Sequence, residues 1–120
     1  GTGVAVEDPQ VRQQIAGFAA EMMVMRMSAY RNAWRLDQDG LPGAEGSTLK
    51  VFWSELDQRM KKAALEILGP RAMVPEGDPL ALDDGYWAYE SLWSRAATIY
   101  ARTSEVQRNI IASRVLGLPR

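Results

Sequence analysis

Residues 8–36, "DPQVRQQIAGFAAEMMVMRMSAYRNAWRL", predict one long amphipathic helix. Asp8 is a favoured N-cap residue, and Pro9 suits the first helical position. Apolar residues recur at steps of three and four, at Val11, Ile15, Phe18, Met22, Met25, Ala29, Ala33 and Leu36. A second apolar row runs beside the first, at Ala19, Met23, Met27, Tyr30 and Trp34. We therefore expect this helix to be contacted on more than one side, and to end at Gly40, Pro42 and Gly43.

Three further helices follow. The second is expected to begin between Pro42 and Thr48 and to stop at Gly69 and Pro70, with Gly69 as a left-handed cap. Its inward residues are predicted to be Leu49, Phe52, Trp53, Leu56, Met60, Ala63, Ala64 and Ile67. Residues 70–84 contain three prolines and are predicted to form an ordered loop.

Asp83 or Asp84 is predicted to cap the third helix. Its inward residues are expected to be Tyr89, Leu92, Trp93, Ala96, Ile99 and Tyr100. The fourth helix carries Val106, Ile110, Ile111 and Val115 on one face and ends at "GLPR", residues 117–120. Short connections favour antiparallel neighbours, so the sequence predicts an all-α fold, an antiparallel up-and-down four-helix bundle over a single domain, residues 1–120.

Composition narrows the function. The 120 residues are 47% hydrophobic and 24% charged, as in a soluble globular domain, and the formal net charge of −1 argues against nucleic-acid binding. No apolar run approaches the ~20 residues of a membrane span, and no signal peptide is recognisable, so we expect a cytoplasmic protein. Without cysteine or histidine, no thiolate nucleophile and no metal site is expected. The first residue is Gly1 rather than Met, which indicates a fragment of a longer chain.

The helical pattern breaks at "TIYARTSEVQRNII", residues 98–111. Ser104 and Gln107 have the spacing of a capping box, in which each side chain binds the backbone N–H of the other residue. A newly begun helix also presents unpaired N–H groups that suit an anionic or carbonyl-bearing ligand. Residue types alone do not separate the cap from the binding site.

The run "IYARTSEVQRNIIASRVLGLPR", residues 99–120, strongly resembles the C-terminus of acyl-CoA dehydrogenases, especially bacterial ones. The likeness extends more loosely to "DPQVRQQIA", "MRMSAYRNAW" and "LKVFWSELDQRMKKAALEILGP". It implies the helical C-terminal domain of a flavoenzyme that binds FAD and removes hydrogens from the α and β carbons of an acyl-CoA thioester. In that family a carboxylate takes the α proton while the flavin accepts hydride.

The resemblance assigns roles to the residues of the break. Ala101 occupies the usual position of the Glu base, so this motif supplies no catalytic residue. The base is then expected on a helix upstream of residue 1, or in an active partner subunit. Arg102 stands where the family has a glycine beside the thioester, and the acyl site is expected to include Arg102 and Tyr100. The FAD contacts are expected at Thr103, Ser104 and Glu105.

A second family site, Gln-x-x-Gly-Gly at the end of the helix that corresponds to the second helix here, touches the FAD of a neighbouring subunit. This chain has "EILGP", residues 66–70, and keeps only Gly69 as a cofactor contact. The resemblance also implies an acyl-CoA substrate, a homo- or hetero-oligomer, and an electron acceptor flavoprotein as partners. We expect the isolated 120-residue chain to be inactive. The alternative is a non-catalytic helical assembly subunit or module derived from the family, supported by the departures at Ala101, Arg102 and Pro70.

Overall fold

The computed structural model describes residues 4–40 and 43–119. They form the α-helices α1 (Pro9–Asp39), α2 (Glu45–Leu68), α3 (Tyr86–Trp93) and α4 (Ser104–Ile110), and the described ranges contain no strand. Short helical turns are η1 (Ala5–Glu7), η2 (Pro70–Met73), η3 (Leu82–Gly85), η4 (Ala96–Thr98) and η5 (Ile111–Val115), the last with π-helical hydrogen bonding. The predicted all-α class is confirmed. In the described ranges, no helix is long and apolar enough to cross a membrane.

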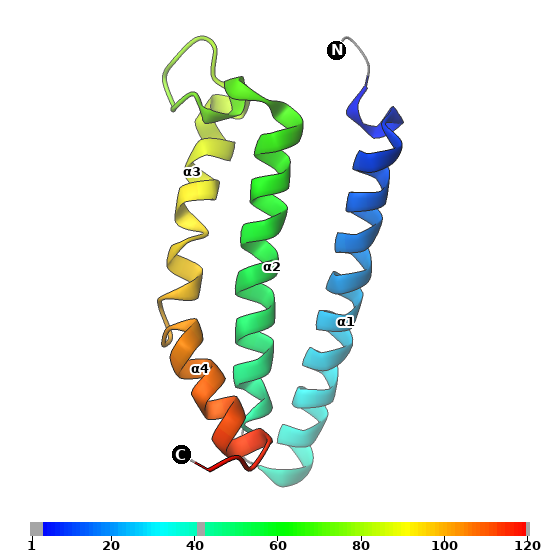
Figure 1. Cartoon of the computed structure of the whole chain (residues 1–120), viewed down its shortest axis with the longest axis vertical. Helices are drawn as coiled ribbons and strands as arrows, with labels where there is room; N and C mark the ends of the chain where they lie inside the picture. The colour runs from blue at the N-terminus through cyan, green and yellow to red at the C-terminus, as the bar shows by residue number, and fades with distance from the viewer. Residues whose placement is uncertain (1–3, 41–42, 120) are drawn as a thin grey trace.

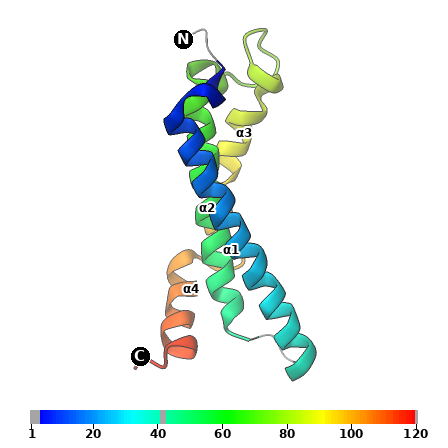
Figure 2. The same cartoon turned by 90° about the vertical axis from the view of Figure 1, so that its right-hand side faces the viewer.

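The helices form an elongated array of 53 × 28 × 27 Å in which α2 lies between α1 and the C-terminal half of the chain (Figure 1). The chain runs down α1, back up α2, and then down again through α3 and α4. These last two helices follow one another along α2 in the same direction, and the view turned by 90° shows them at opposite ends of it (Figure 2). The antiparallel up-and-down order of four helices is therefore not confirmed.

Helix α1 has the predicted ends but no buried residue among those described. Asp8 Oδ1 accepts a hydrogen bond of 2.8 Å from Gln10 N, and Gly40 closes the helix in the left-handed conformation at φ 69°. The expected second apolar row lies open to solvent, with Met23 60% and Trp34 63% exposed. No described residue of this chain covers that row, so contact on more than one side of α1 stays a prediction.

The core is small and lies around α2. Its buried apolar members are Leu56, Ala63, Ala72, Ala88 and Ala97, joined by the buried serines Ser54 and Ser94. Small side chains face α2 from the C-terminal half because they allow the backbones to approach closely and pack without voids. Lys61 of α2 adds an ion pair to Glu90 of α3 at 2.6 Å and one to Asp57 at 3.1 Å.

The inward face predicted for the third helix is wrong. Tyr89, Leu92, Trp93, Ile99 and Tyr100 are all exposed, while the buried residues of this segment are Ala88, Ser94 and Ala97. The helix also ends at Trp93 and gives way to a 3₁₀ turn, η4. Side-chain size explains this packing. The close contact with α2 admits only small side chains, so the aromatic side chains lie on the opposite face of the helix.

The loop after α2 is ordered, as predicted, by two short helical turns. The predicted Asp83 or Asp84 cap of the third helix is wrong, because the N-cap residue is Gly85, at φ 78°, without a side-chain hydrogen bond. Asp83 instead accepts a hydrogen bond from a side chain of α3, and Asp84 accepts one from the loop backbone. Asp83 Oδ2 accepts from Trp87 Nε1 at 2.6 Å, and Asp84 Oδ1 accepts from Gly77 N at 3.3 Å.

Candidate functional site

The break between η4 and α4 is a left-handed turn. Ala101 has φ 52° and Arg102 has φ 78°, although neither is glycine. Each left-handed residue with a Cβ costs about 1–2 kcal/mol relative to a right-handed one. Two side chains from other elements hold the carbonyls of this turn: Gln107 Nε2 of α4 donates to Ala101 O at 2.8 Å, and Lys50 Nζ of α2 donates to Arg102 O at 2.9 Å. The turn is thus fixed by tertiary contacts.

The predicted Ser104–Gln107 capping box is wrong by one residue. The N-cap is Thr103, whose Oγ1 accepts from Val106 N at 3.4 Å, and Ser104 is the first residue of α4. Gln107 reaches back to Ala101 O instead of to the Ser104 backbone N–H. The Ser104 side chain is therefore released from capping. It is only 6% exposed, and its hydroxyl has no hydrogen-bond partner in the described part of the chain.

Charges around the turn come from three elements. Hydrogen bonds from its own backbone N–H and from the Thr103 hydroxyl, aided by Arg108 and Lys50, lower the pKa of the Glu105 carboxyl. Arg108 is paired with Glu55 of α2. Arg102 is exposed, and it forms no ion pair with any residue that the structure describes. Two of the N–H groups that open α4 have acceptors in this chain, because Val106 N donates to Thr103 Oγ1 and Gln107 N donates to Thr103 O.

An apolar patch adjoins the turn. Tyr100 is 46% exposed, and its ring centroid lies 6.4 Å from that of Trp53 on α2. Ile99 is exposed beside it. The structure therefore brings the predicted residues Tyr100, Arg102, Thr103, Ser104 and Glu105 into one segment, because they are consecutive in the chain. It adds Lys50, Trp53 and Gln107 to them. Sequence reasoning missed Lys50 altogether, since no local pattern links it to a turn more than fifty residues later.

Gly69 does not join this group. It follows the far end of α2, nineteen residues beyond Lys50, which places it about 30 Å away along the helix. Its φ of 75° and ψ of −164° let the chain turn into Pro70, but this is not the left-handed cap expected from the sequence. No atom lies within 4 Å of a Cβ added there, so a close approach by this chain does not require glycine.

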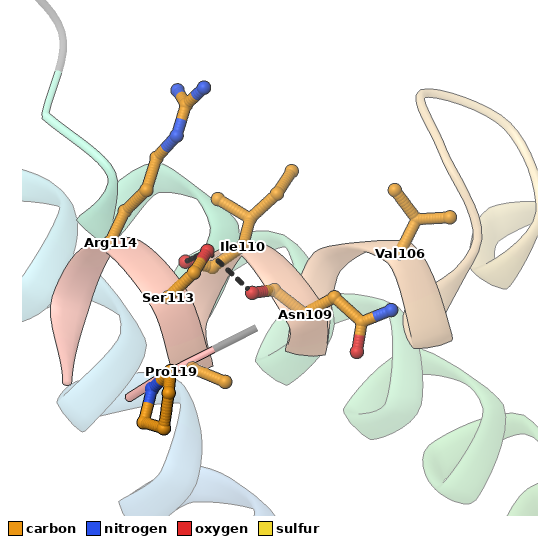
Figure 3. A pocket seen from close by; sticks show the side chains of 7 residues that line it. Val106, Asn109, Ile110, Ser113, Arg114 and Pro119 are labelled. Carbon is orange, nitrogen blue, oxygen red and sulfur yellow. Dashed lines mark hydrogen bonds between the residues drawn. The ribbon is translucent and has the colours of Figure 1, made fainter. Parts of the chain in front are cut away.

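A surface pocket of about 520 Å³ lies on the C-terminal side of the turn (Figure 3). It is lined by Val106, Asn109, Ile110, Ala112, Ser113, Arg114 and Pro119. The Ser113 hydroxyl donates to Asn109 O at 2.9 Å, so this hydroxyl is occupied within the helix. Of the predicted site residues none lines the pocket. No group of three or more His, Cys, Asp or Glu that could hold a metal ion occurs in the described ranges.

Comparison with known proteins agrees with the resemblance seen in the sequence. The family model described as "Acyl-CoA dehydrogenase, C-terminal domain" matches residues 2–116. Acyl-CoA dehydrogenase IpdE1 of Mycobacterium tuberculosis is 32% identical over 119 residues, which are 97% of this chain and 29% of that protein. Its namesake from Mycolicibacterium smegmatis is 32% identical over 97% of this chain and 27% of its own length. The chain thus spans less than a third of these relatives.

Solved structures give the same result. The ChsE4-ChsE5 complex from Mycobacterium tuberculosis contains a chain that matches with a TM-score of 0.82 and 29% identity, over 97% of this chain and 29% of that one. A structure named "Tcur3481-Tcur3483 steroid ACAD" matches with a TM-score of 0.85 and 26% identity, over 97% and 30%. The chain belongs to the acyl-CoA dehydrogenase family, whose C-terminal helical domain it represents.

Proposed function

We propose that the full-length protein is a FAD-dependent acyl-CoA dehydrogenase that oxidises an acyl-CoA to its 2,3-enoyl form. In this proposal the turn from Tyr100 to Glu105 forms one wall of the flavin and thioester site. The supporting observation is the left-handed backbone of Ala101 and Arg102, held by Gln107 and Lys50 within the segment that carries the family motif. A backbone held in this way can present its groups to a ligand without rearranging.

The residues of the turn fit a flavin. Acyl-CoA dehydrogenases generally use FAD, which when bound accepts hydride from the substrate. The Ser104 hydroxyl and Gln107 Oε1 are buried polar atoms without a partner in the described residues, and buried polar groups are normally paired. Thr103, Ser104 and Glu105 are the residues that would hold the cofactor. Gly69 lies too far from this turn to serve the same flavin, so any FAD contact of Gly69 belongs to a site shared with another subunit.

The proton acceptor lies outside the turn. Ala101 carries only a methyl group, and the lowered pKa of Glu105 makes its carboxylate a weak base. In this proposal the base is supplied by a helix upstream of residue 1 or by a partner subunit, as the family resemblance implies. What this chain supplies is position: Tyr100 offers an apolar ring beside the acyl group, and the clamped carbonyls of Ala101 and Arg102 fix the wall against which the thioester lies.

Partners follow from the exposed surfaces and the relatives. The open apolar rows of α1 and α3 support a homo- or hetero-oligomer, and one solved relative is itself named as a complex of two proteins. An electron acceptor flavoprotein would reoxidise the enzyme, and we place the protein in the cytoplasm. Because another solved relative is named a steroid ACAD, a steroid-derived acyl-CoA is the first substrate to test, with a straight-chain acyl-CoA as the control.

Ser104→Ala in the full-length protein tests the cofactor assignment. Its hydroxyl has no partner within the described chain, so the substitution removes no internal hydrogen bond and the fold should tolerate it. We expect lower flavin content, measured by absorbance after purification. Ser113→Ala is the matched control, since that hydroxyl bonds to the carbonyls of its own helix. Equal flavin content in both variants would contradict a flavin contact at Ser104.

A second candidate function is a non-catalytic assembly subunit, favoured by the missing base at Ala101. A full-length protein that is purified without flavin but still forms a defined oligomer would support it over the enzyme. The isolated 120-residue chain should be inactive in either case. Reduction of an electron acceptor by this fragment, given FAD and acyl-CoA, would refute that expectation.

A further inference from the structure

We propose that Arg102 is a specificity-determining residue that binds an oxyanion of the thioester ligand, with Lys50 as the positioning residue that holds it. The inference rests on the proposed function and deepens it by naming the chemical group recognised. A guanidinium pairs strongly with a carboxylate or a phosphate through two parallel hydrogen bonds. Those two groups are the anions that an acyl-CoA ligand offers, on the acyl chain and on the coenzyme.

The first support is conformational. Arg102 stands at φ 78°, where glycine is the residue with no steric penalty. An arginine there destabilises the fold unless its side chain makes an interaction that offsets the cost of the positive φ. It is exposed and has no carboxylate partner among the described residues, so the folded chain gains nothing visible from its charge. A ligand that needs this charge gives a reason for keeping the residue in a strained conformation.

The second support is how the turn is held. Lys50 Nζ donates to Arg102 O at 2.9 Å, and Gln107 Nε2 donates to the preceding carbonyl at 2.8 Å. With both carbonyls fixed, the direction in which the Arg102 side chain leaves the backbone is fixed as well. Lys50 also places a second positive charge at the turn, and its contact there is with a neutral carbonyl. The charged side chains at the turn and its ion pair are the cations Lys50, Arg102 and Arg108 and the anions Glu55 and Glu105, which leaves one net positive charge toward an incoming ligand.

The test measures dissociation constants by calorimetry on the full-length protein purified with its flavin and any partner subunit. The probes are adipoyl-CoA, hexanoyl-CoA and S-hexanoylpantetheine, which carry respectively an acyl carboxylate with coenzyme phosphates, the phosphates alone, and neither. Arg102→Gln removes the charge at similar size. Arg95→Gln is the matched control, an exposed arginine of the same segment without an ion pair in the described residues.

In Arg102→Gln we expect adipoyl-CoA, alone or together with hexanoyl-CoA, to lose about tenfold in affinity while S-hexanoylpantetheine is unchanged, and we expect Arg95→Gln to change none of the three. Loss confined to adipoyl-CoA identifies an acyl carboxylate, and loss shared by both CoA esters identifies a coenzyme phosphate. Arg102→Lys should restore part of the affinity, and Lys50→Met should weaken the same probe as Arg102→Gln. Arg102→Gly, which fits φ 78° without strain, should bind like Arg102→Gln and so excludes misfolding as the cause.

Two results overturn the inference. If Arg102→Gln changes all three dissociation constants by less than about twofold, the arginine binds no ligand anion. If the wild-type protein binds none of the probes, there is no anion site to assign. Flavin content separates this failure from failure of the proposed function. If the protein carries flavin and binds hexanoyl-CoA, and Arg102→Gln leaves the dissociation constants unchanged, only the inference is refuted. If the protein is colourless and binds no probe, both are refuted.

Discussion

Lys50→Met in the full-length protein should loosen the turn that precedes α4. The substitution removes the hydrogen bond from Lys50 Nζ to Arg102 O while keeping the apolar part of the side chain on α2. A hydrogen bond from a charged donor contributes about 1.5–3 kcal/mol. Lys50 is only half-buried and water can replace it at the carbonyl, so we take the lower end, about 1.5 kcal/mol.

Amide hydrogen exchange measured by mass spectrometry reports this loss locally. The Gln107 N–H donates to Thr103 O at 3.0 Å, and the Val106 N–H donates to Thr103 Oγ1 at 3.4 Å, so both amides are protected only while the turn is formed. When exchange proceeds through local opening, a loss of about 1.5 kcal/mol accelerates it by about tenfold. We expect that acceleration in the peptide that contains these two amides and little change in peptides from α1.

Lys62→Met is the matched control, because Lys62 lies on the same helix with a side chain 72% exposed and a long 3.7 Å contact to Glu66. Lys50→Arg keeps a charged donor and should restore part of the protection. If Lys50→Met and Lys62→Met accelerate exchange at the turn equally, or if Lys50→Met accelerates it by less than about twofold, the hydrogen bond from Lys50 to Arg102 O does not hold the turn in place.

Three further perturbations test the fold around the site in the full-length protein. Gly85→Ala should lower the free energy of unfolding by about 3 kcal/mol or more, because the new Cβ would lie 2.2 Å from Glu76 N. In the control Gly77→Ala the new Cβ meets no atom within 4 Å, so the loss should be only about 1 kcal/mol, for the positive φ. Equal losses in denaturant titrations would contradict this. Lys61→Met should cost about 1–2 kcal/mol. Burial lowers the pKa of Lys61, but hydrogen bonds to Glu90 and Asp57 outweigh burial and leave the pKa raised. The stability that Lys61 contributes is therefore complete below its unfolded pKa of about 10.4 and is lost as pH rises through the folded value. Above that pH the melting temperature should fall less in Lys61→Met than in the wild type. Hydrogen bonds from Arg59 lower the pKa of Glu21, so the stability that Glu21 contributes is present above its unfolded pKa of about 4.3 and is lost as pH falls through the folded value. Arg59→Gln should therefore make the melting temperature depend less on pH in the acid range. An unchanged acid range would show that this pair does not link α1 to α2.

Both ends of α1 and the C-terminal end of α2 could be predicted from sequence because helix ends depend on nearby residues, although Gly69 does not adopt the expected left-handed conformation. Asp8, Pro9, Gly40 and Gly69 act through backbone geometry within a few residues, and the structure places each at a helix end. The Asp83 or Asp84 cap failed for a related reason. Acidic residues suit caps and left-handed loops alike, and here both have positive φ, so the choice depended on how the loop meets the backbone of Glu76.

The inward face of the third helix could not be predicted from periodicity. Tyr89, Leu92 and Trp93 recur at helical steps, and periodicity indicates that something covers such a face without saying what. In this chain α2 meets the small residues Ala88 and Ala97, and the aromatic face lies open. The pattern of one segment does not say which other segment or partner covers such a face, and this chain spans less than a third of its relatives.

The candidate site shows what a motif does and does not encode. The resemblance located the break at Tyr100–Glu105 because those residue types stand next to one another, but it did not give the backbone conformation at Arg102, where the family has a glycine. In the structure Arg102 has the left-handed conformation that glycine adopts without strain, with φ 78°. Two contacts compensate for the missing glycine, one from Gln107, within the motif, and one from Lys50, on another helix. The geometry of the turn is therefore a property of the packed domain, and for that reason a side chain with new chemistry can replace glycine there while the wall of the site stays in place.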